Sequence, residues 1–258
     1  MFNWLKTLAA LIGINRPKAI PDTLWRHTLQ RYPFLARLSA ADQLQLRQLV
    51  GQFLAHKEFS GANGLTVTDK MAVAIAAQAC LPVLHLGLSW YDDFTGIVVH
   101  AGAMLARRQR TDRAGVVHNY HEALLGEAMH GGPVTLSWQD AAASGDTAKR
   151  GHNVVIHEFI HKIDMKDGQA DGCPPLPSRA AYAAWKQAMK TAYSQFCEQV
   201  SMAERFGGDA PWLDAYGATA PAEFFAVACE AFFMNRERFT EEFPELTVLF
   251  DQFFKIRQ

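Results

Sequence analysis

The chain has 258 residues, of which 49% are hydrophobic and 20% charged, an ordinary composition for a globular protein with a sizeable core. Lys and Arg total 25 against 26 Asp and Glu, so no charge excess indicates direct nucleic-acid or anionic-membrane binding. No apolar run is long enough to span a membrane. The four cysteines are far apart, form no C-x-x-C pair and follow no secretory signal, which indicates reduced thiols and a cytoplasmic location.

The chain is expected to divide into an N-terminal segment, residues 1–20, and a single domain, residues 21–258. In the first segment, Phe2, Leu5 and Leu8 keep helical spacing, which predicts a short amphipathic helix or tail. Lys6 precedes a short apolar run, but no small-x-small cleavage site follows, so this segment does not read as a signal peptide.

Helical periodicity and capping residues predict most of the remaining elements. Ser39, with Asp42 three residues later, is expected to begin a helix that continues to about residue 54. Pro221 is expected to occupy the first position of another helix, which reaches Met234. Further helices are predicted over residues 22–31, 71–80, 178–206 and 240–255, the third with an aromatic stripe facing the core, and loops over 59–66 and 168–178.

Strand signals lie in the middle of the chain. β-branched runs predict strands over residues 95–100 and 134–138, with a weaker one in 114–120. Residues 141–145 are expected to form a small-residue loop, followed by a helix from about Thr147 or Asn153 to Asp164. These elements predict an α+β fold, mostly helical with a small mixed sheet. Residues 134–138 are expected to form the exposed edge strand that precedes this helix and pairs with an extended peptide.

The helix that ends at Asp164 carries the pattern H-E-x-x-H. On a helix, residues four apart lie on one face, so His157 and His161 can offer two imidazole nitrogens to one zinc ion. Glu158, next to the first histidine, can act as general base on a water molecule at that ion. The alternative is a fortuitous match on a helix that binds no metal.

A catalytic zinc site needs a third protein ligand, and the residues leave four candidates. Asp167 has the right separation for one known layout, but that layout needs a turn-forming glycine where this chain has Asp164. Asp164 itself lies one turn beyond His161 and is better suited to holding a ligand or a neighbouring loop.

The other two candidates are Glu223 and Glu230, the only charged residues of an otherwise apolar helix. An apolar helix is buried, and a buried carboxylate needs a partner, for which a metal ion is suitable. The alternative is that both carboxylates face solvent. Glu223, near the start of the helix, is better placed to reach the mouth of a site.

Several segments together resemble the Mlc titration factor A family of bacterial metallopeptidases. These are HEFIHKID (157–164), DAYGATAPAEFFAVACEAFF (214–233), CLPVLHLGLSWYDDF (80–94), GPVTLSWQD (132–140) and GHNVVIHE (151–158). The likeness covers the chain from about Pro21 to Phe254. It implies a zincin-like fold whose core is similar to the catalytic domain of anthrax lethal factor.

The resemblance also implies roles for particular residues. Zinc, one ion per chain, would be held by His157, His161 and Glu223, with Glu158 as the base and Tyr216 assisting at the oxyanion. His118 is similar to a further family histidine associated with the metal, where it would block the open position, although a lone histidine is as readily structural.

The expected function is zinc-dependent, aminopeptidase-like hydrolysis of short peptides. The family is named for sequestering a glucose-responsive transcriptional repressor, so an Mlc-like repressor is a second expected partner. The alternative function is therefore a regulatory module that titrates a repressor, with peptidase activity secondary. A pure binding module would not need Glu158 between two metal ligands, which favours the enzyme.

Overall fold

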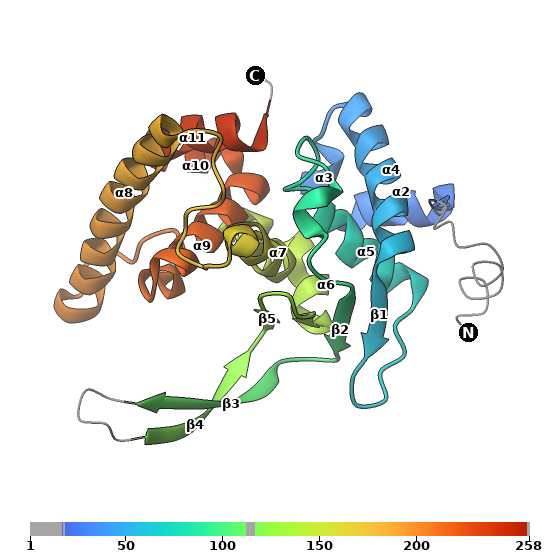
Figure 1. The fold of residues 1–258 in the computed structure, drawn as a ribbon, viewed down its shortest axis with the longest axis horizontal. Helices are drawn as coiled ribbons and strands as arrows, with labels where there is room; N and C mark the ends of the chain where they lie inside the picture. Colours follow the sequence, from blue (N-terminus) through green and yellow to red (C-terminus); the bar gives the residue numbers. More distant parts are fainter. Residues whose placement is uncertain (1–16, 18, 112–116, 257–258) are drawn as a thin grey trace.

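The computed structural model describes residues 17, 19–111 and 117–256 (Figure 1). The proposed helix over residues 1–20 lies almost wholly outside this range, so the division of the chain at residue 20 stays a prediction. The described helices are α2 (Asp22–Arg31), α3 (Pro33–Ala36), α4 (Ala40–His56), α5 (Asp69–Cys80), α6 (Trp138–Thr147), α7 (Val154–Asp164), α8 (Arg179–Phe206), α9 (Pro221–Met234), α10 (Arg236–Glu242) and α11 (Pro244–Phe254). Short 3₁₀ helices are η1 (Leu88–Tyr91), η2 (Ala148–Arg150), η3 (Met165–Asp167) and η4 (Ala215–Ala218).

The sheet is small and mixed, which confirms the predicted α+β class. Its strands are β1 (Glu58–Gly61), β2 (Gly96–His100), β5 (Gly126–Ala128) and β6 (Val134–Ser137), in the spatial order β1-β2-β6-β5. Strands β1, β2 and β6 run parallel, and β5 pairs antiparallel with β6 at one edge. Strand β1 lies where the sequence predicted only a loop, because residues 58–61 find a partner strand 38 positions later.

The prediction that residues 134–138 form the edge strand is wrong. Strand β6 lies inside the sheet between β2 and β5, and β5 forms the edge. Alternating burial along a strand reports which side chains face the core, whereas edge position depends on which other strands pair with it. The predicted loop at 141–145 is also wrong, since these residues lie in α6, where Ser137 accepts a hydrogen bond from the Asp140 amide as the helix cap.

A two-stranded hairpin extends from the body of the molecule (Figure 1). It consists of β3 (Met104–Thr111) and β4 (Val117–Leu124), which pair antiparallel. The weak strand signal in 114–120 corresponds to the start of β4, while residues 114–116 lie outside the described residues.

The predicted helices are confirmed where capping signals were clear. Ser39 accepts a hydrogen bond from the Asp42 amide at 3.1 Å, and Ser178 caps α8 through the Ala181 amide at 3.1 Å. Pro221 takes the first position of α9 as predicted. The single segment expected over 240–255 is two helices, α10 and α11, because Pro244 begins a new helix.

Helix α7 lies at the centre of the molecule, between the N-terminal helices and the C-terminal helices (Figure 1). Val155, Ile156, Phe159, Ile160 and Ile163 are all fully buried. The Phe159 ring lies 5.0 Å from that of Tyr91, and the apolar α9 also packs against α7. This packing holds the H-E-x-x-H segment rigidly with respect to the sheet and α9, while His157 and His161 stay partly exposed.

Lys162 fastens α7 to the turn that follows the edge strand. Its side chain is fully buried, and its ammonium group donates to the carbonyls of Met129 and Gly132 at 2.7 and 3.0 Å and to Asp93 at 3.0 Å. All three ammonium donors therefore have acceptors. The two carbonyls lie in the β5–β6 connection, so this residue links the metal-ligand helix to the edge strand.

Replacing Lys162 with methionine is expected to lower the free energy of unfolding by about 3 kcal/mol, because the Asp93 carboxylate and two carbonyls lose a buried donor. Urea unfolding of chelator-treated protein measures this loss without a contribution from metal binding. The control is Lys166→Met, since Lys166 is exposed and donates to the Ser89 carbonyl at 2.8 Å. Equal midpoints for the two variants would contradict the assignment.

The structure also bears on the predictions about cysteines and membrane spans. Cys80, Cys173, Cys197 and Cys229 are all free, in agreement with reduced thiols. Among the described residues, no helix has the length and apolar character needed to cross a membrane.

Candidate metal centre

The start of α7 is determined by local hydrogen bonds and by a close approach of α9. The Asn153 side chain accepts a hydrogen bond from the Ile156 amide at 3.0 Å and donates to Gln78 at 2.9 Å. Gly151 has φ +70°, and a Cβ there would lie 3.0 Å from Ala231 on α9. Glycine therefore lets the chain turn into α7 while packed against α9.

Three side chains from α7 and α9 converge at one point. His157 Nε2 lies 3.0 Å from Glu223 Oε2, and His161 Nε2 lies 3.2 Å from the same oxygen. The two imidazole nitrogens lie 3.2 Å apart. Among the described residues, these three form the one group of His, Cys, Asp or Glu side chains with the spacing to hold a metal ion. Asp164 and Asp167, two of the other candidates for a third ligand, lie outside it.

These distances fit a zinc ion. Ligand atoms about 2.0–2.1 Å from a tetrahedral zinc lie roughly 3.3 Å from one another, close to the observed separations. The donor set of two imidazoles and one carboxylate is also one that catalytic zinc uses.

The electrostatics of the group also favour a cation. Burial alone would lower the pKa of His157, but its hydrogen bonds to Glu223 and Glu230 raise that pKa well above the usual range. Burial would raise the pKa of Glu223, yet contact with both imidazoles lowers it below the usual range. The cluster therefore attracts positive charge, which a metal ion supplies in place of a proton.

Glu158 lies beside this group, beneath the edge strand. Its side chain is buried, and burial raises its pKa to about 7, partly offset by the neighbouring imidazoles. A Cβ on Gly126 would lie 2.4 Å from Glu158 Oε1, so only glycine lets the first residue of β5 approach this carboxyl group. A carboxyl group with a pKa near neutrality suits proton transfer in both directions.

Glu230 was one of the four candidates for the third ligand, and it contacts the other nitrogen of His157 instead. Its Oε1 lies 2.7 Å from His157 Nδ1, and its Oε2 accepts a hydrogen bond from the Asn153 amide. The carboxylate is almost fully buried. Such a contact orients the imidazole so that Nε2 faces the convergence point. The seven-residue separation from Glu223 places both carboxylates on one helix face, two turns apart, on either side of one imidazole.

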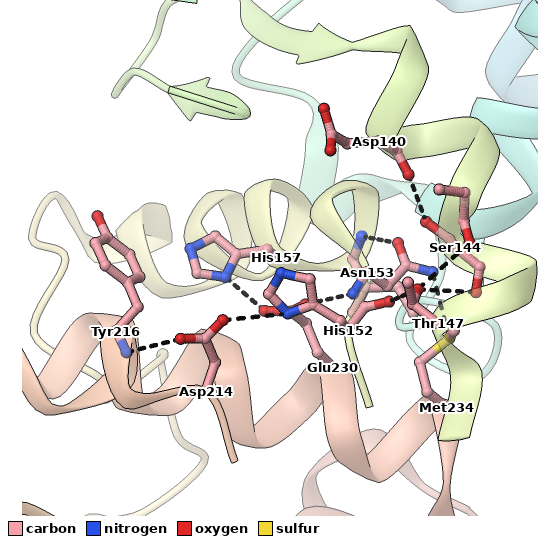
Figure 2. Close-up of polar contacts among 12 residues, drawn as sticks. Asp140, Ser144, Thr147, His152, Asn153, His157, Asp214, Tyr216, Glu230 and Met234 are labelled. Carbon is pink, nitrogen blue, oxygen red and sulfur yellow. Dashed lines mark hydrogen bonds and ion pairs between the residues drawn. The ribbon is translucent and has the colours of Figure 1, made fainter. Parts of the chain in front are cut away.

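His152 and Asp214 extend this network toward Tyr216 (Figure 2). His152 Nδ1 lies 3.6 Å from Glu230 Oε2 and 3.6 Å from Asp214 Oδ2. Asp214 Oδ1 accepts a hydrogen bond from the Tyr216 amide at 2.9 Å, which caps η4. The half-exposed Tyr216 ring lies 6.1 Å from the His157 ring. The Asp214 cap thus holds the backbone of the predicted residue Tyr216 beside His157.

Asp164 holds a neighbouring loop, one of the two roles that its position suggested. Its Oδ2 accepts a hydrogen bond from the Gly172 amide at 2.9 Å, while its Oδ1 is buried with no hydrogen-bond partner among the described residues. Gly172 in turn accepts a hydrogen bond from the Trp185 indole at 2.8 Å. Burial raises the pKa of Asp164 to about 7.

This raised pKa predicts a pH-dependent effect of Asp164→Asn. The carboxyl group binds a proton more tightly in the folded chain, so its contribution to stability is complete below its unfolded pKa of 3.8 and is lost as pH rises through 7. Between pH 5 and pH 8, the wild type should therefore lose about 2–3 kcal/mol relative to the variant. Denaturant unfolding of both proteins at the two pH values measures this difference, and a pH-independent difference would contradict it.

His118 belongs to β4, where it pairs with Arg110. Its side chain lies outside the described residues, so its association with the metal stays a prediction. Sequence reasoning gave no weight to His152 and did not consider Asp214 or Gly126. The only local signal was at Asp214, two residues before Tyr216, the separation of a side chain that caps a turn.

Comparisons with known proteins agree with this geometry. Residues 6–255 match the model of a family described as glucose-regulated metallo-peptidase M90. The chain is 36% identical to Mlc titration factor A of Klebsiella pneumoniae (strain 342) over 232 residues, 90% of this chain and 85% of that protein. It is 35% identical to the protein of the same name from Serratia proteamaculans (strain 568) over 242 residues, 93% of this chain and 90% of that one.

Proposed function

Because this chain belongs to the glucose-regulated metallo-peptidase M90 family, we propose that it is a zinc-dependent peptidase that hydrolyses short peptides. The observation that carries the proposal is the convergence of His157, His161 and Glu223 beside a buried carboxyl group, Glu158. A binding protein would have no need for a proton-transfer group at that position.

His157, His161 and Glu223 would hold the ion, with Glu230 orienting the first imidazole. Zinc in this position supplies Lewis-acid chemistry, polarising the scissile carbonyl and lowering the pKa of water. Glu158 takes a proton from the attacking water and transfers it to the leaving amine. The Tyr216 hydroxyl donates a hydrogen bond to the developing oxyanion.

Strand β5 is the proposed support for the substrate. It lies at the edge of the sheet, and Gly126 approaches the Glu158 carboxyl group. An extended peptide that pairs with an edge strand is held by main-chain hydrogen bonds, which do not depend on its sequence. The proposal includes a zincin-like fold, a cytoplasmic location and aminopeptidase-like cleavage of short peptides.

Purified protein is expected to contain about one zinc ion per chain and to lose hydrolysis of alanine oligopeptides when a chelator removes the metal. Restoring zinc should restore the rate, because the ligands come from rigid buried helices. Elemental analysis and peptide hydrolysis, measured on the same samples, test both statements. Full activity in metal-free protein would refute the proposal.

A second candidate function rests on the relatives' name, Mlc titration factor A. This name describes proteins that titrate the Mlc repressor, and an Mlc-like repressor is therefore a proposed partner of this chain. Binding of a repressor and hydrolysis of peptides are separable. A variant that lacks the proton-transfer group but still binds the repressor would assign regulation to binding alone.

A further inference from the structure

A cavity of about 240 Å³ opens beside His157 and Glu158, on the side where α7 begins. Pockets that hold whole drug-sized ligands are larger, about 300–1,000 Å³, so this one suits a single residue of a peptide. Because it adjoins the proposed reacting groups, that residue would flank the cleaved bond. Its remaining lining is Leu125, Gly126, His152, Val154, Asp214, Tyr216, Val227 and Glu230.

The lining combines aliphatic and acidic side chains. Leu125, Val154 and Val227 provide aliphatic surface, while Asp214 and Glu230 add two carboxylates to that of Glu158. None of the described lining residues is Lys or Arg. A long aliphatic side chain that ends in an ammonium group matches both parts, since its stem packs on apolar surface and its charge meets a carboxylate.

Asp214 has the capacity to accept a further hydrogen bond. Its Oδ1 accepts from the Tyr216 amide at 2.9 Å, whereas its Oδ2 faces His152 Nδ1 at 3.6 Å, beyond hydrogen-bond range. The Glu230 carboxylate is already bonded to His157 and Asn153. His152 Nδ1 lies 3.6 Å from Asp214 Oδ2 and 3.6 Å from Glu230 Oε2, so both carboxylates adjoin the His152 ring. An ammonium group near His152 would therefore find its strongest new acceptor in Asp214.

We propose that this cavity is a specificity pocket for a positively charged amine on the residue next to the cleaved bond, with Asp214 as its recognising carboxylate. The inference rests on the proposed peptidase function. Two sources supply this chemistry: the α-ammonium group of a free amino terminus, and the side chain of a lysine residue.

The test uses alanine tetrapeptides in which each position in turn is lysine or norleucine, with the amino terminus free or acetylated. Mass spectrometry identifies the cleaved bond, and kcat/KM is compared within matched pairs. If the pocket takes a side chain, lysine next to the cleaved bond is favoured over norleucine by roughly tenfold, the contribution of one charged hydrogen bond. If it takes the amino terminus, acetylation costs a similar factor instead.

Asp214→Asn removes the charge and keeps an oxygen to cap η4. The ratio of kcat/KM between the charged and uncharged member of each pair should therefore fall close to one. Ratios measured within one protein cancel any loss of folding or metal content. The matched control is Asp171→Asn, since Asp171 is exposed and its Oδ1 accepts from the Cys173 amide at 3.0 Å in the same kind of turn. The control should keep the wild-type preference. The inference is overturned if the wild type prefers neither lysine over norleucine nor a free over an acetylated amino terminus. It is also overturned if Asp214→Asn retains the preference that the wild type shows.

Failure of the peptidase proposal is distinguishable from failure of this one. If metal-loaded wild type hydrolyses none of the peptides, the same peptides are titrated into it by calorimetry. Tighter binding of the cationic member of each pair, lost in Asp214→Asn, upholds the pocket without catalysis. Equal binding of charged and uncharged members overturns it.

Discussion

Replacing Glu158 with glutamine is expected to reduce kcat for peptide hydrolysis by roughly 10²–10⁴-fold, the usual contribution of general acid–base catalysis. Glutamine has the same shape and fits beneath Gly126, but it cannot take a proton from water or return one to the leaving amine. Since Glu158 is not one of the three converging ligands, zinc content should stay at the wild-type level. Hydrolysis and elemental analysis of the same preparation measure both effects.

Unchanged turnover in Glu158→Gln would remove this residue from the mechanism. The same variant separates the two candidate functions. If it still binds an Mlc-like repressor as tightly as the wild type, regulation does not require peptide cleavage. Loss of repressor binding along with hydrolysis would link the two activities.

Replacing Glu223 with alanine should lower zinc affinity by more than roughly 100-fold, because it removes one of three protein ligands. Substitution of a residue that only orients a ligand usually costs about 10–100-fold. Glu230→Gln is the matched comparison, since Glu230 lies two turns further along α9 and contacts His157 Nδ1. The glutamine oxygen can still accept a hydrogen bond from the imidazole. Its NH2 group, however, would face the Asn153 amide, which is also a donor, so that hydrogen bond is lost.

Competition against a chromophoric chelator gives the zinc affinity of both variants. The expected order of affinity is wild type, then Glu230→Gln, then Glu223→Ala. A Glu223→Ala protein with full zinc content and activity would make Glu230 or an aspartate the third ligand. Glu230 could take that role only by leaving its present contacts, since its Oε1 contacts His157 Nδ1 and its Oε2 accepts from the Asn153 amide.

Local chemistry made much of the fold predictable. Helix caps act over three residues, so Ser39 identified the start of α4 without any tertiary information. The α7 helix was predicted from about Thr147 or Asn153 to Asp164, and the structure shows that it begins at Val154, with Asn153 as its cap. The errors lie where pairing partners are distant. Strand β1 pairs with residues 38 positions away. The prediction of β6 as the edge strand is wrong because nothing in its own residues indicates that β5 pairs with it on the side away from β2.

The sequence by itself determined that His157 and His161 share a helix face with Glu158 between them, and that α9 carries two carboxylates on an apolar background. Only the tertiary structure decided which carboxylate meets both imidazoles, because Glu223 contacts them from 62 and 66 positions away. It also decided that Glu230 orients His157 and that Asp214 and His152 line a cavity beside them. The reason is physical: helical spacing determines which residues share a face, whereas the packing of α7 against α9 determines which atoms come within bonding distance.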